Sequence, residues 1–260
     1  MTKHILPTLR HVVQILVDGQ EKLRVLDGER IRSLHFSAGV VQSSMRLSEP
    51  FELDLSYTRA MMGFQLFNAT PRDILLVGLG GGSLSKYCHR RFPQARVTTL
   101  EINPEVIALR DQFLIPPDDG RFRIVETDAC DYLARDDIQA DIILVDGYDA
   151  AGLPACLCSE PFYANCWKAL ATNGVLVVNL WGGEPNRTVY LDRLKRIFDG
   201  RVWWSRPRDS RSLIAFAIKN DRYFPQWSRL MTEARQLDAR YRLDLSMVVN
   251  DMREHPSIDD

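Results

Sequence analysis

The sequence has few cysteines, and their number and spacing indicate neither a disulfide framework nor a metal site. They are Cys88, Cys130, Cys156, Cys158 and Cys166. An odd number of cysteines in a chain of this size does not suggest paired disulfides. A structural zinc site would need two cysteine pairs or clustered histidines, and the five histidines are scattered. We therefore expect buried or half-buried thiols and no metal.

Neither an excess of one charge nor a long apolar run is present. The 33 basic and 34 acidic residues give a net charge of −1, so nothing attracts the chain as a whole to nucleic acid or to an anionic membrane. Apolar runs such as Ile142–Val145 and Val175–Val178 are strand-sized, far below the roughly 18 residues of a membrane span. No apolar leader follows Met1–His4, and we expect a cytoplasmic protein without membrane or nucleic-acid partners.

The first 50 residues predict a small antiparallel β domain. Short apolar and β-branched runs alternate there with Asp-Gly pairs, a strong hairpin signal: 12–17, Asp18-Gly19, 23–26, Asp27-Gly28 and 31–36. From Asp54 to Pro71 the apolar residues recur at helical spacing instead. We place a domain boundary at this change of period, with an N-terminal β domain over 1–50 and a second domain over 51–260.

From residue 73 onward, strand-like and helix-like segments alternate. The predicted strands are 73–78, 96–101, 122–126, 141–146 and 174–180, and a closing hairpin is predicted over 201–205 and 212–218. Helices are predicted near 84–92, 104–114, 129–135, 160–170 and 225–241. This order is typical of an α/β fold with a doubly wound, mostly parallel sheet, here of seven strands.

A glycine-rich loop follows the first of these strands. Gly78, Gly80, Gly81 and Gly82 lie between an apolar strand and a helix. Glycine lets the backbone approach a ligand without a Cβ clash, and the start of a helix offers free N–H groups. A tight strand-to-helix turn would produce the same pattern, so the loop alone is weak evidence for a nucleotide.

Carboxylates at the ends of the next two strands favour a nucleoside. Glu101 ends the second strand, where it can accept hydrogen bonds from both ribose hydroxyls. Asp128, followed by Ala129, ends the third strand and is placed to receive an adenine amino group. Contiguous glycines and a second acidic residue suit S-adenosylmethionine or a relative better than NAD, whose pyrophosphate requires a Gly-x-Gly-x-x-Gly loop.

The fourth strand ends in two further carboxylates, Asp146 and Asp149. A carboxylate at this edge of the sheet can take a proton from an attacking amine or fix its orientation. The alternative is that Asp146 caps a turn and that Asp149 is solvated.

Together with three further segments, these residues resemble the spermidine synthases, aminopropyltransferases built on the class I S-adenosylmethionine-dependent methyltransferase fold. The segments are Val40–Ser43, Tyr57–Met61 and Ser159–Tyr163. The resemblance covers roughly residues 12 to 220 and implies a Rossmann-like catalytic domain. It also implies transfer of an aminopropyl group from decarboxylated S-adenosylmethionine to an amine such as putrescine, by a homodimer.

The resemblance assigns roles by position. Glu101 and Asp128 would bind the ribose and the adenine, and Asp146 would help to deprotonate the acceptor amine. The second carboxylate, Asp149, would contact the far end of the acceptor. The remaining predicted substrate contacts are Gln42, Tyr57, Tyr148 and Tyr163.

Several positions depart from the family pattern, and most of these departures remove a negative charge or add a positive one. Gly81 stands where the family has an aspartate, Thr58-Arg59 replaces His-Glu, and Asp149-Ala150 replaces Asp-Pro. Three arginines, Arg206, Arg208 and Arg211, occupy the loop of the closing hairpin. A pocket so altered would bind a polycation less well. The alternative is that Arg59 and the three loop arginines point to solvent and pair with Asp or Glu. Two alternatives stay open: an enzyme of the methyltransferase type that uses intact S-adenosylmethionine and a non-polyamine acceptor, and a non-catalytic nucleoside-binding relative.

Overall fold

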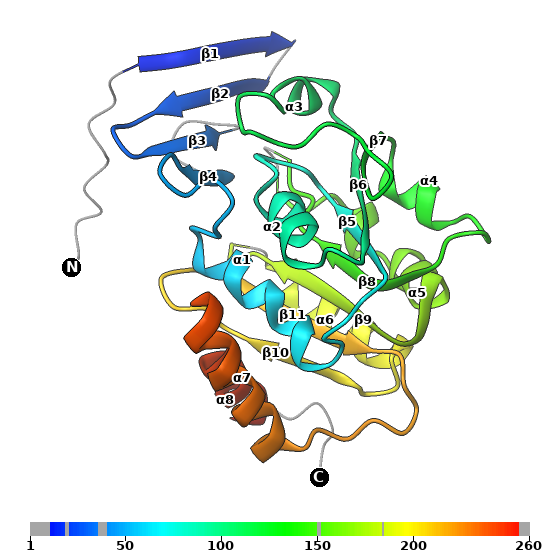
Figure 1. Cartoon of the computed structure of the whole chain (residues 1–260). Helices are drawn as coiled ribbons and strands as arrows, with labels where there is room; N and C mark the ends of the chain where they lie inside the picture. Colours follow the sequence, from blue (N-terminus) through cyan, green and yellow to red (C-terminus); the bar gives the residue numbers. More distant parts are fainter. Residues whose placement is uncertain (1–10, 19–20, 36–40, 150–151, 184, 255–260) are drawn as a thin grey trace.

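The N-terminal part of the chain is a four-stranded antiparallel sheet in the order β1-β2-β3-β4 (Figure 1). The computed structural model describes residues 11–18, 21–35, 41–149, 152–183 and 185–254. The strands are β1 (His11–Asp18), β2 (Glu21–Asp27), β3 (Ile31–His35) and β4 (Ser43–Arg46). The predicted meander is confirmed, although Gly19 of its first turn lies outside the described residues.

A seven-stranded sheet in the order β10-β11-β9-β8-β5-β6-β7 forms the centre of the molecule. Five strands are parallel: β5 (Asp73–Val77), β6 (Arg96–Glu101), β7 (Phe122–Glu126), β8 (Ala140–Val145) and β9 (Leu170–Leu180). The last two, β10 (Val202–Ser205) and β11 (Leu213–Ile218), pair antiparallel. The chain runs outward from β5 to β7 and then returns to β8 on the other side of β5. The predicted fold class is confirmed, and this reversal marks the place where open α/β sheets bind ligands.

Alternating side chains along the central strands divide the core between the two faces of the sheet. Ile74 and Leu76 of β5 belong to one apolar cluster, and Leu75 and Val77 belong to the other. The first face is covered by α1 (Ser56–Met61), η1 (Met62–Leu66), α2 (Ser83–Arg91), α3 (Pro104–Ala108), α7 (Trp227–Tyr241) and α8 (Leu245–Glu254). The second face is covered by α4 (Ala129–Leu133), η2 (Cys156–Cys158), α5 (Glu160–Ala169) and α6 (Arg187–Ile197).

Side-chain caps determine where three helices begin. Asn103, Asp128 and Ser159 each precede a helix and accept a hydrogen bond from a backbone N–H two or three residues later, at 2.9, 2.7 and 3.2 Å. Such caps satisfy amides that have no partner within the helix. Two of the capped helices, α3 and α4, directly follow strands β6 and β7, so the caps also fix the strand exits that carry the candidate ligands.

The helices differ from the sequence prediction at three places. The structure contains α6 and α8, which were not predicted, and α3 ends at Ala108 although a helix was predicted to residue 114. The helix predicted over 225–241 is present as α7. Among the described residues, no helix combines the length and apolar character needed to cross a bilayer.

Candidate active site

A cavity of about 720 Å³ opens at the carboxyl ends of the parallel strands. Strand exits contribute residues within 77–80, 100–102, 127–130 and 146–149, and the other walls come from 41–43, 54–59, 152–157 and 209–212. A volume of this size falls within the range of small-molecule sites. The cavity therefore has the position and the size expected for a nucleoside with a second substrate.

The first half of the glycine loop forms part of the cavity wall. Gly78 and Gly80 line it, and Gly78 has φ +93°. A Cβ at Gly78 would lie 2.5 Å from the carbonyl oxygen of Asp146. Glycine is required here because β5 and β8 leave the sheet so close together.

The second half of the loop does not line the cavity. A Cβ on Gly81 would lie 2.7 Å from Oγ of Ser43 and 2.8 Å from the ring of Phe113, and one on Gly82 would lie 2.5 Å from the Ile115 side chain. Neither Gly81 nor Gly82 lines the cavity, so their contact with the nucleoside stays a prediction that the structure does not support. An aspartate at position 81 has no room unless these neighbours move.

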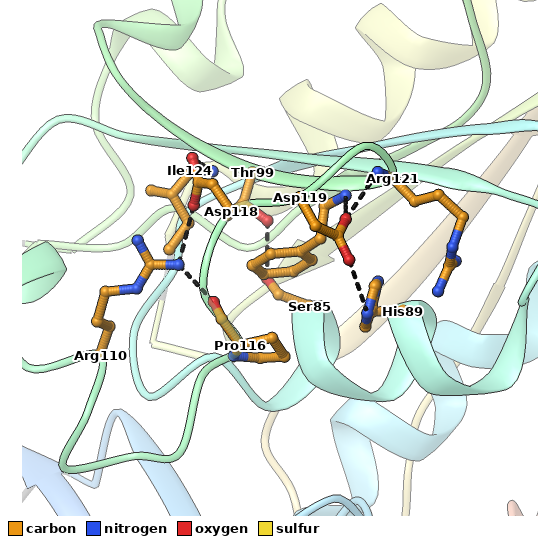
Figure 2. A network of polar contacts seen from close by, with 10 residues as sticks. Ser85, His89, Thr99, Arg110, Pro116, Asp118, Asp119, Arg121 and Ile124 are labelled. Atoms are coloured by element: carbon orange, nitrogen blue, oxygen red, sulfur yellow. Dashed lines mark hydrogen bonds and ion pairs between the residues drawn. The ribbon is translucent and has the colours of Figure 1, made fainter.

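Polar contacts fix the segment that packs behind the glycine loop (Figure 2). The guanidinium of Arg110 donates to the carbonyl oxygen of Pro116 and to Asp118, the latter over 2.9 Å. Asp119 accepts from two backbone amides at 2.7 Å and lies 4.0 Å from Nε2 of His89. These contacts hold together the segment between α3 and β7, whose Phe113 and Ile115 pack against the loop.

Glu101 at the end of β6 is oriented by two backbone amides. Oε2 accepts from the N–H of Leu79 at 2.8 Å, and Oε1 accepts from the N–H of Asn103 at 2.9 Å. Burial raises the pKa of Glu101, and these backbone hydrogen bonds lower it in part. Each carboxylate oxygen keeps a further lone pair. The side chain can therefore accept hydrogen bonds from two vicinal hydroxyls in the cavity.

Asp128 is both a helix cap and a cavity residue. Its Oδ1 accepts from the N–H of Cys130 at 2.7 Å, which leaves Oδ2 for a ligand. The adjacent Ala129 also lines the cavity. Cys130 forms a disulfide with Cys156, so the expectation that all five cysteines are thiols is wrong. The two residues lie 26 positions apart, and only the fold brings them together.

Asp146 follows β8 and is the most perturbed carboxylate of the cavity. Its Oδ1 accepts a hydrogen bond of 2.8 Å from the Asn179 amide on β9. Burial raises the pKa of Asp146 from 3.8 to about 6, although hydrogen bonds from Asn179 and Tyr57 lower it. The pKa of Tyr57 lies well above its usual value because of burial and the nearby Asp146 charge. A raised carboxyl pKa near neutrality suits a group that accepts a proton.

Other predicted substrate contacts surround Asp146. The hydroxyl of Tyr148 donates to the carbonyl oxygen of Asn179 and accepts from the N–H of Trp181, both at 2.7 Å. These two hydrogen bonds fix the ring in the cavity wall. Asp149 is exposed, and its Oδ1 accepts from the N–H of Gly152 at 2.9 Å.

Gln42 and Tyr57 also line the cavity, and Tyr57 lies beside Asp146. The Tyr57 hydroxyl lies 3.4 Å from the carbonyl oxygen of Gln42, which joins the N-terminal sheet to α1. One predicted contact, Tyr163, is placed elsewhere. It is completely buried in the core below α5 and does not line the cavity, so its assignment as a substrate contact is corrected.

Sequence reasoning missed Asn179. This residue is 5 % exposed, lines the cavity and holds Asp146, while its own Oδ1 has no partner among the described residues. The sequence did offer a sign of its role, because Asn179 is a polar side chain inside the apolar run of β9, between Val178 and Leu180.

The cavity is more acidic than the arginine substitutions suggested. Among the described residues, six carboxylates line it, from Asp54, Glu101, Asp128, Asp146, Asp149 and Asp209, with two arginines, Arg59 and Arg211. Neither Arg206 nor Arg208 lines it. The guanidinium of Arg59 donates to the carbonyl oxygen of Asp54 at 2.6 Å and pairs with Asp244 at 3.3 Å. The carboxylates that line the cavity outnumber the arginines, so a cationic substrate is compatible with the site.

Known proteins resemble this chain in sequence and in fold. Residues 54–186 match the family model described as the spermine/spermidine synthase domain. The polyamine aminopropyltransferase of Chromobacterium violaceum is 36 % identical, with 94 % of each chain covered. That of Neisseria meningitidis serogroup B is 38 % identical over 87 % of each.

Two solved structures show the same fold at lower identity. The probable spermidine synthase of Corynebacterium glutamicum matches with a TM-score of 0.72 at 19 % identity, covering 88 % of both chains. Human methyltransferase-like protein 13 matches with a TM-score of 0.66 at 23 % identity, covering 73 % of this chain and 93 % of that protein. The likeness in sequence extends along almost the whole chain. This chain belongs to the spermine/spermidine synthase family.

Proposed function

We propose that this protein transfers the aminopropyl group of decarboxylated S-adenosylmethionine to an amine acceptor such as putrescine, with methylthioadenosine as the second product. The observation that carries the proposal is that Glu101, Asp128 and Asp146 line one cavity at the carboxyl edge of the sheet. The relatives named polyamine aminopropyltransferases support the same reaction.

In this proposal the donor occupies the side of the cavity formed by β5, β6 and β7. Glu101 accepts hydrogen bonds from the ribose hydroxyls, and Asp128 accepts one from the adenine amino group beside Ala129. Gly78 and Gly80 let the backbone approach the nucleoside. None of these contacts requires a metal ion, because the ribose hydroxyls and the adenine amino group each donate a hydrogen bond directly to the protein.

The acceptor lies on the side formed by Asp146, Asp149, Tyr57, Gln42 and Tyr148. The amine nitrogen attacks the methylene carbon next to the sulfonium, the carbon–sulfur bond breaks, and its electron pair stays on the sulfur of the neutral thioether. The proton lost by the amine passes to Asp146. Because the leaving group needs no acid, positioning and one base supply most of the acceleration.

We further propose that residues 1–50 and 51–260 are two structural units, that the protein is a homodimer, and that it works in the cytoplasm. The separate β1–β4 sheet supports the first statement. The family resemblance supports the second, and light scattering coupled to size exclusion tests it. Cell fractionation tests the third.

The function is tested with purified protein, each candidate donor and a panel of diamines. We expect methylthioadenosine and an aminopropylated amine to form only from the decarboxylated donor. Methyl transfer from intact S-adenosylmethionine, with no reaction of the decarboxylated form, would contradict the proposal and support a methyltransferase. No reaction, despite tight nucleoside binding, would support a non-catalytic nucleoside-binding protein.

A further inference from the structure

The disulfide between Cys130 and Cys156 lies in the wall of the cavity. Both residues line it, and their Cα atoms are 6.5 Å apart, a usual separation for disulfides. Cys130 belongs to the first turn of α4, and Cys156 begins η2. The bond therefore joins two segments that border the proposed donor site from different directions.

These two cysteines differ from the others in their access to solvent. Cys156 is exposed and Cys130 is half-buried, whereas Cys88, Cys158 and Cys166 are buried thiols. Burial raises the pKa of Cys88 and of Cys166, which keeps these sulfurs protonated and unreactive. Only the pair in the cavity wall is open to a reagent in solution.

The position of the bond connects it to donor binding. The N–H of Cys130 donates to Oδ1 of Asp128, the proposed adenine ligand. On the other side, Cys156 follows Gly152 and Pro154, which line the cavity and continue from Asp149. A covalent link at Cys130 holds this loop against the helix that Asp128 caps.

We propose that Cys130 and Cys156 form a thiol–disulfide exchange site that takes low-molecular-weight disulfides and controls the donor pocket. The proposal rests on the proposed function, because it assigns the adjacent pocket to the nucleoside. Cross-linked protein holds the loop over 152–158 in the position that binds the nucleoside. Reduced protein must order this loop at each binding event, which costs affinity.

The small disulfide is the oxidant in this exchange. The Cys156 thiolate attacks one sulfur of the small disulfide, forms a mixed disulfide and expels one small thiolate. The Cys130 thiolate then attacks the Cys156 sulfur, closes the protein disulfide and expels the second small thiolate. The protein loses two electrons and two protons, and the small disulfide gains them as two thiols.

A metal ion is the competing occupant of the same atoms. Asp128, Cys130 and Cys156 each offer one ligand atom, and these atoms lie within 4.8 Å of one another. Two thiolates and a carboxylate would suit zinc. The structure favours the disulfide, because it joins the two sulfurs directly.

The test uses the full chain in a reduced form, prepared with dithiothreitol, and in a form oxidised with glutathione disulfide. Differential alkylation and peptide mapping locate the cross-link, and calorimetry measures methylthioadenosine affinity. Hydrogen exchange over 152–158 reports on the loop without any nucleoside. Cys156→Ser removes the pair, and Cys158→Ala, two residues away, is the matched control that keeps it.

We expect oxidised protein to carry the Cys130–Cys156 link, to exchange more slowly over 152–158 and to bind methylthioadenosine about tenfold more tightly. Cys156→Ser should show the weaker affinity under both conditions, and Cys158→Ala should keep the difference. No cross-link in excess glutathione disulfide, equal affinities of the two forms, or stoichiometric zinc binding that blocks oxidation would each overturn the proposal. The cross-link could form and slow hydrogen exchange while neither form binds methylthioadenosine. That result would overturn the assignment of the pocket to the nucleoside and the control of nucleoside binding, but it would support the redox site.

Discussion

The side-chain amide of Asn179 donates a hydrogen bond of 2.8 Å to Oδ1 of Asp146, across the gap between β9 and the end of β8. Tyr57 gives the same carboxylate a second hydrogen bond. Together these contacts orient a half-buried carboxylate whose pKa of about 6 lies well above that of a solvated aspartate. The following predictions depend on this geometry and on its neighbours.

Replacing the proposed base should separate chemistry from binding. Asp146→Asn keeps the shape of the side chain and an oxygen that can accept from Asn179, but it cannot take the proton. We expect the single-turnover rate to fall about 10²- to 10⁴-fold, with little change in methylthioadenosine affinity. Asp136→Asn, at an exposed carboxylate paired with Lys168, is the control and should retain full activity. An unchanged single-turnover rate in Asp146→Asn would show that another group accepts the proton.

The raised pKa of Asp146 should be visible in stability and in rate. Since the folded-state pKa of about 6 exceeds the ordinary 3.8, protonation stabilises the folded chain at low pH, and this contribution is lost as the pH rises through 6. Asp146→Asn lacks this loss and should be more stable than wild type by about 2 kcal/mol at pH 8, with a smaller difference at pH 4. Urea unfolding at both pH values measures it.

The catalytic pH profile gives a second readout of the same group. The wild-type kcat/KM should rise with pH through about 6, as the carboxylate loses its proton. A flat profile between pH 5 and 7, or an equal stability difference at pH 4 and pH 8, would contradict the assignment.

Replacing Glu101 even by glutamine, which has the same shape, should weaken nucleoside binding. Backbone N–H groups of Leu79 and Asn103 face the two carboxylate oxygens, so the NH₂ of Glu101→Gln must oppose one of them. We expect methylthioadenosine to bind about 10- to 100-fold more weakly, as measured by calorimetry. Glu126→Gln is a matched control, because Glu126 is the exposed register partner of Glu101 on β7. Equal losses of methylthioadenosine affinity in the two variants would show that Glu101 does not bind the nucleoside directly.

Restoring the family's acid at position 81 should harm this protein. The Cβ of an aspartate would meet Ser43 and Phe113 at 2.7 and 2.8 Å, and Phe113 is fully buried, so it must shift within a packed core. We expect Gly81→Asp to lose about 1–3 kcal/mol of stability and to show no gain in diamine kcat/KM. In Gly120→Asp nothing lies within 4 Å of the new Cβ, so this control should be near neutral. Improved diamine turnover in Gly81→Asp would contradict this prediction, because it would show that Ser43 and Phe113 move aside at little cost in stability.

Local sequence was sufficient to predict that three candidate ligands, Glu101, Asp128 and Asp146, lie at one edge of the sheet. Each ligand candidate there directly follows a strand, and parallel strands bring their carboxyl ends to one edge whatever the details of packing. The positions of Glu101, Asp128 and Asp146 in one cavity follow from that rule.

Contacts that depend on helix phase and long-range packing could not be predicted in this way. Tyr163 lies four residues into α5, and only the docking of that helix turns its ring into the core instead of the cavity. The pairing of Cys130 with Cys156 needs both α4 and the loop before α5. Whether Gly81 faces the ligand depends on Phe113, which belongs to a segment that was predicted to be helical.

The missed helix α8 did carry a signal. Its buried residues recur at helical spacing: Leu245, Val248, Val249 and Met252. The segment is short and polar on its other face, so its stability comes from packing against α7 and η1 rather than from its own sequence.

The ion pair between Arg59 and Asp244 connects the turn before the last helix to the wall of the cavity. Arg59 lines the cavity and holds the backbone at Asp54, while Asp244 lies in the turn between α7 and α8. No described residue of α7 or α8 lines the cavity. Arg59 also donates to the carbonyl oxygens of Leu53 and Asp54, so the turn before the last helix supplies one of several contacts that hold this cation at the cavity wall.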